Sequence, residues 1–135
     1  MTTIITRWDQ AQMEPDVEFR MWKALADSFG VRNLIFTPIV HGLGLPGVDG
    51  RIKQVETMRA ALREVEDMPR CFLEPEGEYD VYAIPAGDVA LIFGNTDQSN
   101  LDMALPGETY RIDAPSKHPH LYGPNAAAIA LYLKQ

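Results

Sequence analysis

The sequence predicts an α/β fold in which a mostly parallel sheet is flanked by helices. Short apolar runs alternate with runs at helical spacing from one end of the chain to the other, a pattern typical of α/β layer proteins. The chain has 135 residues, of which 46% are hydrophobic, and this length suits one hydrophobic core. Internal repeats, low-complexity tracts and long linkers are absent from the sequence. We therefore expect residues 1–135 to form a single domain.

The first third of the chain predicts a strand, a helix and a second strand. The β-branched run from Thr3 to Thr6 predicts a short strand. Apolar residues then recur at helical spacing from Asp16 to Phe29. Asp16 is the expected N-cap of this helix, and Gly30 is the expected stop. The run from Asn33 to Thr37 predicts a buried strand.

The middle of the chain predicts a loop, a second helix and a third strand. Four glycines and a proline exclude regular structure between His41 and Gly50. One apolar stripe runs from Arg51 to Asp67 among charged residues, which predicts a layer helix. Arg70 to Glu74 predicts a strand, and Glu74 to Gly87 predicts an acidic, solvated connection.

The last third predicts two more strands and the final helix. Asp88 to Gly94 is the most apolar strand candidate, so we expect it at the centre of the sheet. Glu108 to Asp113 predicts a short strand, and Ala114 to Gly123 predicts a loop that contains proline and histidine. An Ala-rich helix is expected from Pro124 to Lys134, with proline near its first position. The whole chain thus predicts about five strands and three main helices.

Composition limits the function classes. The formal charge is −7, from 12 basic and 19 acidic residues, which argues against nucleic-acid binding over much of the surface. A local basic patch is still compatible with this charge, and its candidates are Arg7, Arg20, Lys23, Arg32 and Lys117. No apolar window reaches the length of a membrane span, and the N-terminus lacks the order of a signal peptide. We therefore expect a cytoplasmic protein without a membrane partner.

Three sequence features resemble ligand sites without completing one. Gly42 to Gly47 has the spacing of a dinucleotide fingerprint, but Pro46 removes a backbone donor from the loop. His118 and His120, with Asp113 nearby, lack a third nitrogen or sulfur ligand, so no metal site is predicted. The single cysteine, Cys71, excludes an internal disulfide and a cysteine-rich zinc site, and its apolar strand predicts inert packing.

Two turns beyond strand ends are better candidates for a small-molecule pocket. They are Phe93 to Asp97 and Ile112 to Gly123. In open α/β sheets, ligands bind beyond the carboxyl ends of strands. If these turns lie close together, they form a natural pocket.

The C-terminal third resembles the SPOUT, or α/β-knot, RNA methyltransferases. The resemblance is carried by Leu91-Ile-Phe-Gly94, Tyr110-Arg-Ile-Asp113 and the segment from Leu121 to Tyr132. These are similar to the family's last three motif segments, which end in an Ala-rich helix. A weaker similarity covers Phe19 to Ile35. The resemblance implies a C-terminal trefoil knot that binds S-adenosylmethionine in a bent shape.

The resemblance also implies roles for particular residues. Arg20 is the nearest counterpart of the family's N-terminal arginine, and Arg20 and Tyr122 are the expected catalytic residues. The cofactor-binding residues that it implies are Phe93, Gly94, Asn95, Ile112, Leu121, Gly123 and Ala126. It further implies a minimal methyltransferase acting on RNA, with tRNA as the expected substrate, and a homodimer. Trp22, Phe29, Ile129 and Tyr132 are candidates for its interface, although burial within the same chain is the simpler interpretation of each.

Departures from the family pattern leave two alternatives open. Asn95-Thr-Asp97 follows the Phe-Gly turn where the family's ribose methyltransferases commonly have Glu, and Tyr122 replaces the family's loop Asn. One alternative is a catalytically inactive knotted binding protein. The other is a nucleotide-binding domain that uses the loop from Gly42 to Gly47.

Overall fold

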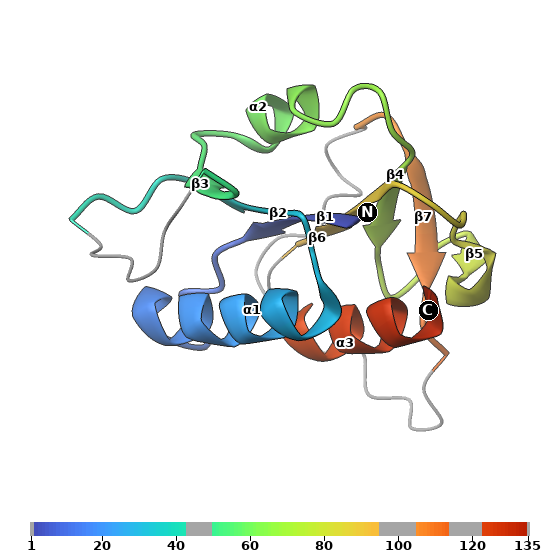
Figure 1. Cartoon of the computed structure of the whole chain (residues 1–135), viewed down its shortest axis with the longest axis horizontal. Helices are drawn as coiled ribbons and strands as arrows, with labels where there is room; N and C mark the ends of the chain where they lie inside the picture. Colours follow the sequence, from blue (N-terminus) through green and yellow to red (C-terminus); the bar gives the residue numbers. More distant parts are fainter. Residues whose placement is uncertain (1, 43–49, 95–104, 114–122, 135) are drawn as a thin grey trace.

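A computed structural model of the chain describes residues 2–42, 50–94, 105–113 and 123–134. Its centre is one sheet of seven parallel strands (Figure 1). The strands are β1 (Thr2–Arg7), β2 (Asn33–Thr37), β3 (Ile52–Gln54), β4 (Arg70–Leu73), β5 (Tyr79–Asp80), β6 (Val89–Phe93) and β7 (Glu108–Arg111). The helices are α1 (Pro15–Phe29), α2 (Met58–Arg63) and α3 (Gly123–Lys134), with a 3-10 turn, η1, at Val81–Ala83. The predicted α/β class with a mostly parallel sheet is confirmed.

Helices cover both faces of the sheet. In Figure 1, α1 and α3 lie side by side under one face, and α2 lies over the other. Successive residues of a strand point to opposite faces, so Ile4 belongs to the core under α1 and α3, and Ile5 to the core under α2. Leu91 and Ile92 divide in the same way. Strands buried on both faces explain the continuous apolar runs in the sequence.

The strand order locates the edge at which ligands bind in this type of fold. The order is β3-β2-β1-β6-β4-β7-β5. The chain runs outward from β1 to β3 and then returns to build the other half, so the order reverses beside β1. Clefts form beyond the carboxyl ends of strands at such a reversal. Strand β6 occupies the middle position, as predicted, and all five of its residues are buried.

The predicted helix from Arg51 to Asp67 is wrong in its first half. Ile52–Gln54 forms β3 against β2, and only Met58–Arg63 is helical. The Thr57 hydroxyl caps the shorter helix by accepting a hydrogen bond of 3.0 Å from the amide of Ala60. The prediction of about five strands also missed β5, which pairs with β7 within the acidic connection. The same apolar spacing fits either a helix or an edge strand. Pairing with β2 makes this segment a strand.

Helix α1 ends as predicted but begins earlier. Gly30 terminates it with φ of 65°, a left-handed conformation that glycine adopts without a steric penalty. The N-cap is Glu14, not Asp16, and Pro15 occupies the first turn. Proline suits this position because the amide that it lacks has no partner within the helix.

Two further predictions concern the trefoil knot and the absence of a membrane-spanning segment. The predicted trefoil knot depends on residues 95–104 and 114–122, which lie outside the described residues. Within the described ranges, no helix has the length and apolar character needed to span a membrane.

Candidate cofactor site

The carboxyl ends of the parallel strands bring together several of the predicted cofactor residues. Phe93 is buried at the end of β6, and Gly94 follows it. Ile112 follows β7 and packs against the core that contains Phe93. Ala126, in the first turns of α3, belongs to the same core. Asn95, Leu121 and Tyr122 lie outside the described residues.

Trp22 joins two of these segments. Its ring lies 5.3 Å from that of Phe93, measured between centroids. A Cβ atom added to Gly123, the first residue of α3, would lie only 3.2 Å from Cζ2 of Trp22. Trp22 itself is fully buried. Its indole is enclosed by its own chain, which is the simpler of the two interpretations of Trp22 and excludes it from a dimer interface.

A buried carboxylate holds the indole of Trp22. Glu18 is 2% exposed and lies one turn before Trp22 on α1. Its Oε2 accepts a hydrogen bond of 3.1 Å from the indole nitrogen of Trp22, and its Oε1 accepts one of 2.7 Å from the backbone amide of Asp9. Burial raises the pKa of Glu18, while these two hydrogen bonds act to lower it. The sequence shows Glu18 only as an ordinary polar helix residue.

A buried pair of opposite charges flanks the end of β6. Arg7 ends β1 and Glu74 follows β4, the two strands on either side of β6. Both side chains are buried. Burial lowers the pKa of Arg7, and the attraction of the Glu74 carboxylate opposes this effect. Glu74 is therefore not part of a solvated acidic loop, as the sequence had suggested.

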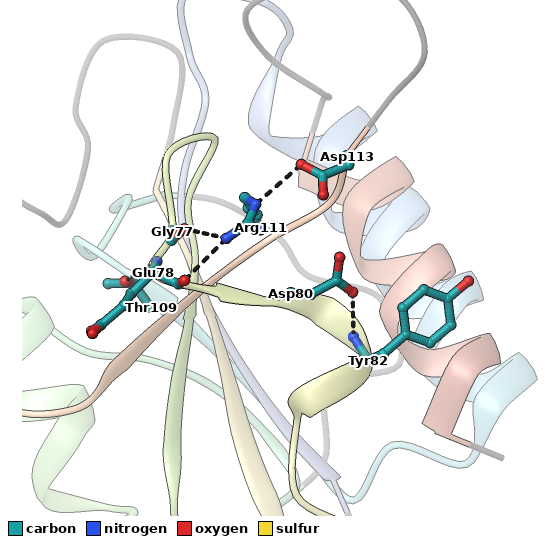
Figure 2. A network of polar contacts seen from close by, with 7 residues as sticks. All are labelled: Gly77, Glu78, Asp80, Tyr82, Thr109, Arg111 and Asp113. Atoms are coloured by element: carbon teal, nitrogen blue, oxygen red, sulfur yellow. Dashed lines mark hydrogen bonds and ion pairs between the residues drawn. The ribbon is translucent and has the colours of Figure 1, made fainter.

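The end of β7 is fixed by Arg111 (Figure 2). Its Nη1 donates hydrogen bonds of 3.1 Å and 3.0 Å to the carbonyl oxygens of Gly77 and Glu78. Its Nε donates a third, of 3.1 Å, to the Asp113 carboxylate. The amide of Glu78 in turn donates to the Thr109 hydroxyl. Arg111 thus ties the segment after β4 to the strand that leads into Ile112.

Arg20 does not point toward this cluster. Residues two apart on a helix are separated by roughly 200° around its axis, so Arg20 and Trp22 lie on opposite sides of α1. The side chain of Arg20 is 68% exposed and forms an ion pair of 3.1 Å with Asp16, one turn earlier. Its proposed catalytic role therefore requires an acceptor approaching from outside this chain's core.

Among the described candidates for a basic patch, Arg7 and Arg32 lie far apart. Arg7 is buried at the carboxyl end of β1, whereas Arg32 is exposed just before β2, at the opposite edge of the parallel sheet. Lys23 pairs with Asp27 at 2.9 Å. Lys117 lies outside the described residues. A patch built from these five residues is not present in the described part of the chain.

The described surroundings of the glycine-rich segment do not favour a phosphate site. Along the chain the segment is followed by β3 and not by the helix that a dinucleotide fingerprint requires, and the nearby start of α1 carries Glu14 and Asp16. An open cavity of about 510 Å³ lies beside Gly42. Its described lining residues are Gln10, Met13, Glu14, Pro15, Asp16, Val40, His41 and Gly42. This lining contains two carboxylates and no Lys or Arg among the described residues, which disfavours an anionic ligand, and residues 43–49 lie outside the described part.

Within the part of the chain that the structure describes, no metal centre is apparent either. The described ranges contain no group of three His, Cys, Asp or Glu side chains placed to hold an ion. His118 and His120 lie outside them. Asp113, which is near these histidines in the sequence, forms an ion pair with Arg111.

Cys71 is expected to resist alkylation in the folded protein. It is 1% exposed, and burial raises the pKa of its thiol to about 11. At pH 8 only about one molecule in a thousand would carry the reactive thiolate. Iodoacetamide at pH 8 should therefore label Cys71 fully in concentrated guanidinium and leave it unmodified in buffer over the same period. Rapid labelling of the native protein, followed by mass spectrometry, would contradict the burial of this strand.

Solved structures resemble this chain over almost its whole length. No family model and no curated protein matches the sequence. A structure concerned with 2-OH methylation of C/U34 on tRNA aligns with a TM-score of 0.78 and 18% identity, covering 99% of this chain and 93% of that one. The SpoU methyltransferase AviRb from Streptomyces viridochromogenes, in complex with AdoMet, aligns at 0.73 and 18%, covering 99% and 58%.

A third match also holds the same cofactor. The AdoMet-bound rRNA methyltransferase from Sinorhizobium meliloti aligns with a TM-score of 0.71 and 15% identity, covering 98% of this chain and 55% of that one. These identities are too low to transfer residue roles, but the shared architecture extends from β1 to α3. The chain therefore has the fold of the SPOUT methyltransferases.

Proposed function

We propose that the protein is an S-adenosylmethionine-dependent methyltransferase of minimal SPOUT type that acts on RNA, with tRNA as the first substrate to test. The observation that carries the proposal is the alignment of 98% or more of the chain with methyltransferase structures, two of them with AdoMet bound. We place the cofactor at the carboxyl edge of the sheet around β6 and β7, where ligands bind in open α/β sheets. We also propose that the protein meets its RNA substrate in the cytoplasm.

The described residues at this edge fit a nucleoside cofactor. Phe93 and Ile112 lie at the ends of β6 and β7, the two strands that flank β4, and both pack into the apolar core beneath this edge. Gly94 lacks a side chain, so a ligand can approach its backbone closely. At Gly123 the space that a side chain would take is filled by the ring of Trp22. Backbone groups of Phe93, Gly94, Ile112, Gly123 and Ala126 would hold the adenine and ribose, together with Asn95 and Leu121.

The reaction makes few demands on side-chain chemistry. When bound, S-adenosylmethionine supplies an electrophilic methyl group on a sulfonium. The chain's part is to align the acceptor with that methyl group and to exclude water. Such positioning can supply a large part of the rate enhancement. A hydroxyl acceptor also needs a base to take its proton. Arg7, Arg20 and Tyr122 are the residues that we propose for orienting the acceptor.

A homodimer would bring further groups to the site. Exposed apolar residues on the two helices that cover one face of the sheet could form its interface. They are Val17 and Met21 on α1, with Ile129 and Tyr132 on α3. Phe29, by contrast, packs partly into its own core. An exposed Arg20 could then face an acceptor held by the partner subunit. Sedimentation analysis of the purified chain would test whether the dimer forms.

The proposed function is tested by a matched pair of glycine substitutions. Gly94→Val adds a branched side chain at the end of β6, and we expect it to weaken binding of S-adenosylmethionine and its demethylated product at least about tenfold. Gly50→Val makes the same change before β3, where a Cβ atom meets nothing within 4 Å, and should leave binding unchanged. Calorimetry measures both, and transfer of a labelled methyl group to bulk tRNA and rRNA measures activity.

Two outcomes would count against the proposal. Wild-type protein that binds neither ligand at millimolar concentration would refute it. Binding with no methylation of any RNA pool would leave a cofactor-binding protein that has lost catalysis.

A further inference from the structure

Trp22 occupies the junction between two segments that the proposed function assigns to the cofactor. Its indole lies against Phe93, at the end of β6, and its Cζ2 approaches the Cα of Gly123 so closely that a Cβ atom there would stand 3.2 Å away. The ring therefore fills the space between the end of β6 and the start of α3. Its position sets how far apart these two segments can lie.

The orientation of the indole is fixed by more than packing. Glu18 is buried, and it accepts hydrogen bonds from the Trp22 ring nitrogen and from the amide of Asp9. Burying a carboxylate costs free energy that an apolar residue would avoid. Two hydrogen bonds offset part of this cost. Rotating the indole in either direction would break its bond to Oε2 of Glu18. The arrangement favours one ring orientation over looser apolar packing.

We propose that Trp22, oriented by Glu18, is a positioning residue for the cofactor: its indole sets the spacing between the end of β6 and the start of α3. This inference rests on the proposed function, because the cofactor is the ligand whose binding the spacing controls. Trp22 itself need not touch the ligand. Its effect passes through Phe93 and Gly123, which line the proposed site.

The chain offers a matched control for Trp22. Its second tryptophan, Trp8, is also buried, but it stacks on Phe36 of β2 with the ring centroids 4.2 Å apart. The two tryptophans thus have similar burial and different neighbours. Trp22→Phe and Trp8→Phe make the same chemical change, so any common loss of stability appears in both variants.

The first experiment measures binding of S-adenosylhomocysteine to the wild type and to these two variants. We expect Trp22→Phe to raise the Kd about tenfold and Trp8→Phe to change it less than about twofold. Ligand-induced change in tryptophan fluorescence should persist in Trp8→Phe and vanish in Trp22→Phe. Urea unfolding of each variant shows whether it is folded at the assay temperature.

A second experiment tests the contact itself through a double-mutant cycle. Gly123→Ala places a methyl group against Cζ2 of Trp22, and we expect a Kd about fivefold higher, because the ring must move by a few tenths of an ångström. Phenylalanine has no atom at the position of Cζ2. The same Gly123→Ala change in the Trp22→Phe background should therefore raise the Kd less than about twofold further.

The outcomes separate this inference from the proposed function. Wild-type protein that does not bind the ligand overturns both. Normal binding by the wild type, with equal Kd values for Trp22→Phe and Trp8→Phe, overturns the role of Trp22 alone. Equal effects of Gly123→Ala in the two backgrounds also overturn it. If Trp22→Phe is too unstable to measure, Trp22→Tyr replaces it as the second background of the cycle.

Discussion

Replacing Gly77 with alanine should destabilise the protein by about 3 kcal/mol, a large share of the stability of a domain of this size. A Cβ atom at this position would lie 2.3 Å from the carbonyl carbon of Tyr110 and 2.6 Å from its oxygen. Both are backbone atoms of β7, so no side-chain rotation relieves the overlap. The turn that contains Gly77 must move away from the sheet.

Hydrogen bonds around Gly77 make such a movement costly. The amide of Glu74 donates a hydrogen bond of 2.9 Å to the carbonyl oxygen of Tyr110. The amide of Gly77 donates one of 3.1 Å to the carbonyl oxygen of Glu74. The carbonyl oxygen of Gly77 also accepts from Arg111. Moving the turn outward breaks or lengthens all three, and each lost bond adds about 1 kcal/mol.

Urea unfolding monitored by circular dichroism measures this effect. Gly50→Ala is the control, because a Cβ atom there has no neighbour within 4 Å, and its free energy of unfolding should change by less than about 0.5 kcal/mol. A Gly77→Ala protein as stable as this control would show that the turn after β4 does not press against β7.

Local signals in the sequence predicted much of the fold. Gly30 ends α1 because its left-handed φ suits glycine, and the unbroken apolar run in β6 indicates a strand with two buried faces. The misread segment is β3, where Ile52 and Val55 fit either a helical stripe or a sheet edge. The backbone amide of Val55 bonds to the carbonyl oxygen of Phe36, a partner that only the folded sheet provides.

The sequence predicts at which edge of the sheet the candidate site lies but not which buried groups surround it. The turns after β6 and β7 stand out because glycine and polar residues follow apolar strands, and parallel strands place such turns at one edge. Glu18 and Glu74 could not be distinguished from solvated acids in the sequence. Their burial depends on partners from other elements, such as the Asp9 amide before α1 and Arg7 at the end of β1.

Removing the guanidinium of Arg111 should weaken the contact between the turn at Gly77 and the end of β7. Arg111→Met keeps a long apolar stem and deletes the three hydrogen bonds to Gly77, Glu78 and Asp113. The Gly77 carbonyl lies in a buried residue, so losing its charged donor is costly. We expect a loss of about 2 kcal/mol in the free energy of unfolding. Amide hydrogen exchange at residues 77–80 should become faster.

The matched control is Asp113→Asn, which weakens only the outer contact. The two side chains of this ion pair are 35% and 65% exposed, and exposed pairs contribute about 0 to 1 kcal/mol. Asp113→Asn should therefore leave exchange at residues 77–80 unchanged.

The two variants also separate stability from ligand binding. Ile112 follows Arg111 directly, so a displaced β7 end should weaken binding of S-adenosylhomocysteine in Arg111→Met several-fold, to an extent of about 1 kcal/mol. Asp113→Asn should bind with the wild-type Kd. If both variants bind equally well while only Arg111→Met is destabilised, Arg111 supports the fold, and the end of β7 takes no part in holding the cofactor.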